Sequence, residues 1–396
     1  MKLSFLSNFA FSLLPFSSSS TLRKIDPGTS IHDVIKDGSN TLSNLEKRGG
    51  SFPESIAHID TIMSLQPNAS RLFDTVAYLS STFPDRYYNS NHGKMASLWL
   101  LRQIETIIAS HINVNEGQSP FGNSGSRVSV SVELIEHPWK QPSLIARITP
   151  VQSSASAGNT KTQKKTNNNK NRKKKKTSVI VVSSHLDTKN FFFSGITPSP
   201  GADDNASGCA TILEGFRLLL AHFTTHPDQL ANEIQFHWYA GEEAGLKGSR
   251  AVLSNTTLVP RARVRAQLHQ DMTGFMPRSS SSNARYFSLI RDNTNLALNK
   301  FVTLILRTLF HDSSKEGETS ILEIEMNDRC GYGCSDHFAA HEAGIPVSYL
   351  FEAPLRLANP FAHTPLDTVD RLDAGKMADH ARVVVGFALE LGQYQF

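Results

Sequence analysis

The sequence predicts an α/β fold in a single domain, with a mixed, mostly parallel central sheet flanked by helices. From residue 178 onward, short apolar runs of strand length alternate with longer amphipathic stretches, as in proteins whose parallel strands are joined by helices. The run Ser178–Ser183 (SVIVVS) is apolar on both faces, which is typical of a buried parallel strand. Val128–Ile135 (VSVSVELI) instead alternates polar and apolar residues, as a half-exposed strand does.

Apolar periodicity places the other elements. Ser70–Ser81 and Lys94–His111 are predicted helices, because apolar residues recur in them at steps of three and four. Leu144–Ile148 is expected to form a strand like its neighbour Val128–Ile135. Beyond Ser183 the predicted elements are the helix Ala206–Phe223, the strands Ile234–Tyr239, Val264–Leu268 and Tyr286–Ile290, the helix Asn295–Phe310, the strand Val347–Phe351 and the helix Ala378–Leu391.

The composition is that of an ordinary globular protein, with 39% hydrophobic and 19% charged residues in a chain of 396. No apolar run reaches the roughly 20 residues of a membrane span. The formal charge of +4 comes from one tract, since residues 161–176 carry eight Lys and one Arg, and without these nine charges the remainder is at −5. A protein that binds nucleic acid is expected to carry its positive charge on a folded surface. Here the positive charge is confined to one tract, so we predict no nucleic-acid partner.

The basic tract belongs to a low-complexity segment of Ser, Ala, Asn and Lys, residues 152–177. Such a segment cannot bury apolar surface, so it is predicted to be disordered. A nuclear signal or polyanion tether is one interpretation, and a solvated loop between two sheet strands is the other. The loop is favoured, because the segment lies between Ile148 and Val179, where a hairpin turn would otherwise suffice.

The first twenty residues combine one Lys, an interrupted apolar stretch and a run of Ser, and are predicted to be a signal peptide. The following polar segment contains the dibasic pair Lys47-Arg48, a predicted processing site. Cys330 and Cys334 are close enough for a disulfide, with metal binding as the rival interpretation. Cys209 is predicted to be a buried thiol. A signal and a disulfide both indicate secretion.

Five short segments carry side chains that can bind a metal ion. All five fall at the ends of predicted strands or in the loops that follow, where open α/β sheets bind their ligands. They supply the nitrogen and oxygen donors that suit zinc. The segments are SSHLD (Ser183–Asp187), PGADDNASG (Pro200–Gly208), AGEEAG (Ala240–Gly245), QDMTG (Gln270–Gly274) and HTPLDT (His363–Thr368).

The spacing within these segments indicates separate roles. His185 and Asp187 can act as a metal ligand and the carboxylate that orients it. In the pair Asp203-Asp204, one carboxylate can bridge two cations. In the adjacent pair Glu242-Glu243, one side chain can bind metal while the other acts as a base. Each residue alone is more often structural, for example as a helix cap. Five coincident segments favour a hydrolase, in which a water shared by two ions loses a proton and attacks a carbonyl.

These segments resemble the zinc aminopeptidases of peptidase family M28, most closely the fungal secreted leucine aminopeptidases. The similarity runs from about Phe52 to the C-terminus and includes FPDRYYNSNHGKMASLWL (Phe83–Leu100) and CGYGCSDH (Cys330–His337). It implies the zinc-dependent exopeptidase fold and two zinc ions per chain. It also implies an enzyme that removes N-terminal leucine or other apolar residues from peptides with a free N-terminus.

The resemblance further implies a role for each site residue. Asp204 would bridge the two ions, and the peptide bond after it would be cis. His185 and Asp271 would bind one ion, and Glu243 and His363 the other. The implied catalytic residues are Glu242 as general base, Asp187 as the partner of His185, and Tyr332 as a donor to the oxyanion. Candidate walls of an apolar substrate pocket, chosen by position, are Met272, Cys330, Tyr349, Phe351 and Leu355. The pair Cys330 and Cys334 resembles a disulfide that fixes this loop.

In the fungal group a signal and a propeptide precede a mature start that resembles FPESIAH, here at Phe52. We therefore expect a signal peptide at 1–20, a propeptide at 21–51 and a peptidase domain at 52–396, secreted as a zymogen and acting as a monomer. Asn68 and Asn255 stand in glycosylation sequences. Asn205 does too, but it lies in the predicted site and is expected to stay unmodified.

Two other functions remain open at this stage. A glutaminyl-cyclase-like zinc acyltransferase would use a similar scaffold with a single zinc ion, and the complete set of five ligands favours the peptidase over it. A receptor-type domain without activity should have lost ligands, and none is missing from the sequence.

Overall fold

The computed structural model of the chain describes residues 51–111, 128–151, 177–277, 284–310 and 321–396. The chain divides into two units, Met1–Ser43 and Asn44–Phe396, and all described residues belong to the second unit. The predicted signal peptide, residues 21–50 of the predicted propeptide and residues 152–176 of the Lys- and Asn-rich segment lie outside the described residues. In the described part of the chain, no helix has both the length and the apolar character needed to cross a bilayer.

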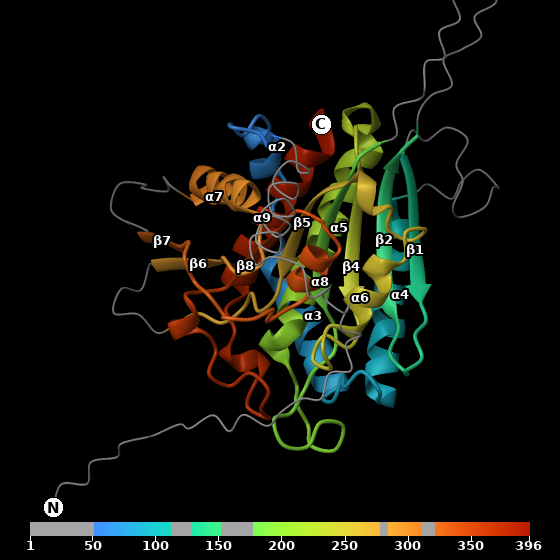
Figure 1. Cartoon of the computed structure of the whole chain (residues 1–396), viewed down its shortest axis with the longest axis vertical. Helices are drawn as coiled ribbons and strands as arrows, with labels where there is room; N and C mark the ends of the chain where they lie inside the picture. The colour runs from blue at the N-terminus through green and yellow to red at the C-terminus, as the bar shows by residue number, and fades with distance from the viewer. Residues whose placement is uncertain (1–50, 112–127, 152–176, 278–283, 311–320) are drawn as a thin grey trace, which may run out of the picture. The chain divides into compact units, whose positions relative to one another are not determined.

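One eight-stranded sheet organises the second unit, with the strand order β1-β2-β4-β3-β5-β8-β6-β7 (Figure 1). Four of its seven neighbouring pairs are parallel, which confirms the mixed, mostly parallel sheet expected from the sequence. The strands are β1 (Val128–Ile135), β2 (Ser143–Pro150), β3 (Val179–His185), β4 (Glu233–Tyr239), β5 (Val264–Gln270), β6 (Ala284–Ile290), β7 (Ile321–Glu325) and β8 (Val347–Phe351).

Helices cover both faces of the sheet. The helices of the described residues are α2 (Ile59–Ser64), α3 (Ala69–Thr82), α4 (Asn91–His111), α5 (Gly208–Thr225), α6 (Lys247–Ser254), α7 (Leu296–Phe310), α8 (His337–Glu342) and α9 (Ala374–Gln393). On one face, Ile180 and Val182 of β3 belong to the same core as α5 and α9. On the other, Val179 and Val181 pack with α6 and α8. Because alternate side chains point to opposite faces, β3 must be apolar at successive positions.

Every helix and strand predicted from the sequence is present, with two notable shifts. The predicted helix Ala206–Phe223 begins at Gly208, because Ala202–Ser207 form a distorted π-helical turn. The last helix, α9, begins at Ala374, and Asp373 caps it by accepting a hydrogen bond from the Lys376 backbone N–H at 2.8 Å. Absent from the sequence-based predictions are the short elements α2, α6, α8 and β7, which have only five to eight residues each.

The expectation that a hairpin turn could join Ile148 to Val179 is wrong. Between β2 and β3 lies β4, whose Ile234 pairs with Ile148 on one side and with Ile180 on the other. β2 and β3 are therefore separated by one strand, a distance of roughly 10 Å at about 4.8 Å per strand. This order places β3 in the interior of the sheet, where both of its apolar faces are covered.

Replacing residues 153–175 by a linker of about eight Gly and Ser residues should leave the fold intact. Such a linker spans roughly 10 Å without strain, and the low-complexity composition offers no apolar area to bury. We expect the midpoint of thermal unfolding, followed by circular dichroism, to stay within about 2 °C of the parent value. A linker of about twelve residues serves as the control for strain. A drop of more than about 5 °C with both linkers would show that the replaced residues stabilise the sheet.

Candidate active site

Adjacent parallel strands end at one edge of the sheet, and the predicted site residues follow them. β4, β3 and β5 are neighbours and run in the same direction. His185 is the last residue of β3, Asp271 comes directly after β5, and the pair Glu242-Glu243 follows β4. Two loops supply the other residues: Asp204 lies between β3 and α5, and His363 lies between β8 and α9. The topology thus brings together residues that are up to 178 positions apart in the sequence.

Asp204 lies between two imidazoles. Its Oδ1 is 3.3 Å from His185 Nε2, and its Oδ2 is 2.9 Å from His363 Nε2. His185 Nε2 is also 3.2 Å from Asp271 Oδ1, and His363 Nε2 is 2.8 Å from Glu243 Oε1. The ligand atoms form two groups of three that share Asp204, and within each group all atoms lie within 4.8 Å of one another. This is the division of ligands that the resemblance implies.

The site buries more acidic groups than basic ones. Besides the three carboxylates of the two groups, Asp187 and Glu242 are at most 9% exposed. Burial raises the pKa of Glu242 well above its usual value, and that of Glu243 as well. Burial acts in the same direction on Asp204, but the charge of His363 and hydrogen bonds from both imidazoles outweigh it, so the pKa of Asp204 falls.

The imidazoles respond to the surrounding carboxylates. Burial favours their neutral forms, yet Asp204 and Glu243 raise the pKa of His363 to about 11. Among the described residues of the two ligand groups, His185 Nδ1 and Glu243 Oε1 are buried atoms without a hydrogen-bond partner. Although Glu243 Oε1 is close to His363 Nε2, the pair is not aligned as a hydrogen bond. An excess of buried carboxylate oxygens around two imidazoles fits divalent cations, which would neutralise the charge.

Two further carboxylates hold the loops that carry the ligands. Asp187 accepts hydrogen bonds from the backbone N–H groups of Glu242 at 3.0 Å and Glu243 at 3.1 Å. Its Oδ1 lies 3.6 Å from His185 Nδ1. Asp367 accepts from the backbone N–H groups of Asp203 at 3.1 Å and Asp204 at 3.0 Å. Asp187 therefore positions the Glu242-Glu243 turn as well as lying next to His185.

The turn that presents Asp204 depends on Gly201. Its φ is +52°, and a Cβ at this position would lie 2.3 Å from the Asp204 carbonyl oxygen. The peptide bond between Asp204 and Asn205 is cis, as the resemblance implies. The Asn205 side chain is fully buried and donates to the Gln270 carbonyl oxygen at 3.1 Å. Asn205 is thus enclosed in the site, whereas Asn68 and Asn255 are exposed.

Arg86 lies in the FPDRYY motif but had no predicted role. Its side chain is fully buried and donates hydrogen bonds to four backbone carbonyls, one of them that of Leu79 at 3.4 Å. The other three acceptors are Leu186 at 3.0 Å, Pro200 at 2.6 Å and Gly201 at 2.7 Å. These residues flank His185 and Asp204, so Arg86 ties together the two segments that carry ligands of different groups.

Ser335 is a second residue that the sequence analysis missed. Its hydroxyl donates to Asp271 Oδ2 at 2.6 Å and lies 2.8 Å from His269 Nε2. It directly follows Cys334, which forms a disulfide with Cys330, so the predicted pairing is present. Ser335 stands in CGYGCSDH, but a hydroxyl carries no charge signal that would single it out from sequence. Cys209 is fully buried, as predicted.

A cavity of about 380 Å³ opens beside the two ligand groups. All five predicted wall residues line it, and they belong to one apolar cluster: Met272, Cys330, Tyr349, Phe351 and Leu355. Glu242 also lines the cavity, while Tyr332 lines it with a side chain that is 69% exposed. The cavity thus has an apolar wall next to acidic and imidazole groups.

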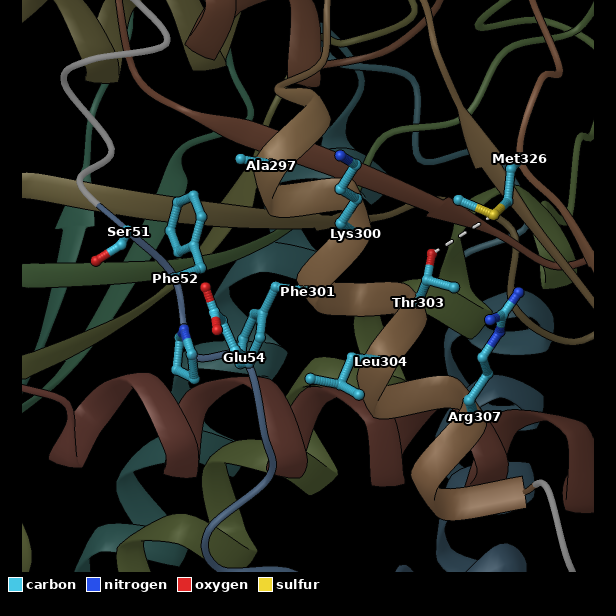
Figure 2. Close-up of a pocket in the computed structure, with 11 residues that line it drawn as sticks. Ser51, Phe52, Glu54, Ala297, Lys300, Phe301, Thr303, Leu304, Arg307 and Met326 are labelled. Atoms are coloured by element: carbon cyan, nitrogen blue, oxygen red, sulfur yellow. Dashed lines mark hydrogen bonds between the residues drawn. The ribbon is translucent and has the colours of Figure 1, made fainter.

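A second cavity, of about 580 Å³, lies between residues 51–54 and α7 (Figure 2). Phe52 and Phe301 stack in its wall with ring centroids 6.3 Å apart, and α7 supplies Lys300 and Arg307. Both metal-ligand groups found among the described residues lie elsewhere. The cavity beside Asp204 is therefore the candidate active site, although it is the smaller of the two.

The profile described as Peptidase family M28 matches residues 167–388. The chain belongs to peptidase family M28. A protein named probable leucine aminopeptidase from Arthroderma otae is 34% identical over 363 residues, which cover 90% of this chain and 84% of the relative. As a member of this family, the chain is a peptide hydrolase.

Solved structures show that the fold is shared. The LapA aminopeptidase of Legionella pneumophila is similar with a TM-score of 0.66 and 24% identity, over 87% of this chain and 77% of LapA. BSAP, a zinc aminopeptidase from Bacillus subtilis, is similar with a TM-score of 0.55 and 16% identity, over 83% of this chain and 96% of BSAP. The exopeptidase-like α/β fold expected from the sequence is therefore confirmed.

Replacing Arg86 by Lys should destabilise this M28 peptidase by about 2–4 kcal/mol, because an ammonium group cannot reach all four carbonyls and leaves buried acceptors unpaired. The measurement is the free energy of unfolding in urea. Arg250→Lys is the matched control, because the Arg250 and Glu342 side chains are 46% and 43% exposed and such a pair contributes less than about 1 kcal/mol. Equal losses in the two variants would contradict the role given to Arg86.

Proposed function

We propose that this chain is a secreted dizinc aminopeptidase that removes N-terminal leucine or other apolar residues from peptides. The observation that carries the proposal is the Asp204 carboxylate, whose two oxygens face the imidazoles of His185 and His363 at 3.3 Å and 2.9 Å. A carboxylate shared in this way between two ligand groups is suited to bridging a pair of cations. The leucine aminopeptidase name of the Arthroderma otae relative and the zinc named for BSAP support the same assignment.

In this proposal His185 and Asp271 would hold one zinc ion, Glu243 and His363 would hold the other, and both groups would share Asp204. When bound, the two ions supply Lewis-acid polarisation of the scissile carbonyl and of the attacking water. A single-zinc acyltransferase would leave one of the two ligand groups without a role, so the peptidase is favoured.

Glu242 is the proposed general base. Its side chain lines the cavity beside the ligand groups, and Asp187 fixes its backbone through the N–H. A carboxylate in this place accepts a proton from the attacking water and then donates it to the leaving amine. The hydroxyl of Tyr332, at the edge of the cavity, is proposed to donate a hydrogen bond to the developing oxyanion.

The substrate preference follows from the shape and charge of the cavity. The acidic groups favour a substrate with a free, protonated α-amine. The apolar cluster around Met272, Tyr349 and Phe351 is proposed to receive the side chain of the first residue. An apolar pocket distinguishes side chains by only about 1–3 kcal/mol per methylene, so several apolar residues should be accepted.

Secretion is supported by the predicted signal peptide and by the disulfide between Cys330 and Cys334. We propose that the peptidase is released by processing close to Lys47-Arg48, before Phe52. Phe52 is only 7% exposed and its ring stacks on Phe301, so a mature chain that starts here would have its first apolar residue anchored. Asn68 and Asn255 are proposed glycosylation sites.

The purified protein should contain two zinc ions per chain and should hydrolyse leucinamide but not N-acetyl-leucinamide. The acetyl group removes the charge of the α-amine that the acidic cavity favours. Metal content can be measured by inductively coupled plasma mass spectrometry, and activity before and after treatment with a chelator. Zinc added back should restore activity. Protein that lacks zinc yet hydrolyses leucinamide, or that cleaves both compounds equally, would contradict the proposal.

Glu242→Gln should retain two zinc ions and lower kcat on leucinamide by about 10²–10⁴-fold, because the amide cannot accept a proton. Glu342→Gln is the matched control, since the Glu342 side chain is 43% exposed and pairs with Arg250 away from the cavity. The control should keep both metal and turnover. If Glu242→Gln retained most of its turnover, another group would have to be the base.

A further inference from the structure

A loop beside the active site exposes four large apolar side chains. Among the described residues, the five most exposed large apolar side chains are Ile196 at 83%, Tyr332 at 69%, and Phe191, Phe192 and Phe193 at 61%, 84% and 61%. Four of them lie within the six residues 191–196, and the fifth lines the active-site cavity. Contiguous exposed apolar groups of this kind mark interaction sites. In Figure 1 the loop is the green segment that projects beyond the lower end of the sheet.

The loop is joined to the metal-ligand residues. The Phe191 ring meets the His363 ring edge to face, with centroids 4.9 Å apart. The Phe191 backbone N–H also donates to the His363 carbonyl oxygen at 3.1 Å. Lys189, two residues earlier, lines the active-site cavity and lies 3.9 Å from Glu243. The exposed apolar groups therefore begin where the cavity ends, at the ligand group of Glu243 and His363.

Hydrogen bonds within the loop hold these side chains outward. Asn190 is only 5% exposed, and its Oδ1 accepts from the backbone N–H groups of Phe192 at 3.0 Å and Phe193 at 3.3 Å. The Phe193 carbonyl oxygen in turn accepts from the N–H groups of Ile196 at 3.0 Å and Thr197 at 2.9 Å. These bonds close the loop backbone on itself, and the rings of Phe192 and Phe193 lie exposed on it, 84% and 61%, where a ligand can reach them.

We propose that Phe192, Phe193 and Ile196 bind apolar side chains of the peptide substrate beyond its first residue. This inference rests on the aminopeptidase function proposed above. Ala362, next to His363, packs with the apolar cluster of the first-residue pocket, whereas the His363 ring packs on Phe191. His363 therefore lies between the pocket and the loop, and the bond to be cleaved lies beside it. An extended peptide advances about 3.4 Å per residue, so its second to fourth residues can reach the loop.

The test compares two peptides of equal length, Leu-Phe-Phe-Gly and Leu-Ser-Ser-Gly, together with leucinamide. The wild-type enzyme should prefer the first peptide by about five- to tenfold in kcat/KM, mainly through KM, because phenyl groups covered by the loop leave water. In the double variant Phe192→Ser/Phe193→Ser, the ratio of the kcat/KM values for the two peptides should fall close to one. Phe191 is left unchanged because it contacts His363.

Met95→Ser is the matched control, since Met95 is 46% exposed on α4 and lies outside the cavity lining. This variant should keep the preference for Leu-Phe-Phe-Gly. The inference is overturned if the wild type shows no preference, if the double variant retains it, or if the variant loses the same factor on all three substrates. The last result would mean that the loop only positions His363.

A lipid surface is the alternative occupant of the loop, and sedimentation with phosphatidylcholine vesicles separates the two. Suppose that the wild type binds vesicles, and that the double variant loses this binding but keeps the wild-type preference between the two peptides. This result would overturn the inference in favour of a membrane. Failure of the wild type to cleave leucinamide would contradict the proposed function itself, and the inference with it. Cleavage of leucinamide without a preference between the peptides would contradict the inference alone.

Discussion

The position of one carboxylate, Asp204, constrains the rest of the active site. Its two oxygens face different imidazoles, so the segments that carry His185 and His363 must approach it from opposite sides. Such a carboxylate is useful only if it is held still, and Asp367 accepts the hydrogen bond of its backbone N–H. On the other side, Arg86 fixes the carbonyls of Pro200 and Gly201. Buried polar contacts therefore hold the turn on both sides, and Ala202 and Ala206 within it also pack in the main apolar core.

Buried polar groups of this kind are costly unless each has a partner, and most of them here are paired. Asp187 uses both oxygens on the backbone of Glu242 and Glu243. Asp271 uses one oxygen on Ser335 and presents the other to His185. Asp271 thus keeps one oxygen directed at its ligand group, while Asp204 directs one oxygen at each group. The parallel strands bring the ligands to one edge, and the second layer of polar contacts orients them.

Much of this could be predicted from sequence, because the informative residues are charged and stand at strand ends. His185 and Asp271 were found in this way, the family resemblance selected Asp204 over Asp203, and the structure brings the three together. Arg86 and Ser335 act through hydrogen bonds to groups far away in the sequence, which no local pattern reveals. The position of β4 between β2 and β3 was missed for the same reason, since strand order depends on long-range pairing. The helices α2, α6 and α8 are too short for an apolar periodicity to be recognised.

The excess of carboxylates suits the site for cations. Without cations, the same excess makes the folding free energy less favourable. Burial raises the pKa of Glu242 and Glu243, which means that the surrounding protein resists their charged forms. Cations that bind the folded chain and find no such site in the unfolded chain stabilise the fold by mass action. The proposed zinc ions would therefore act on stability as well as on chemistry. Bound cations would offset the repulsion between the five carboxyl groups that the fold buries at this edge of the sheet.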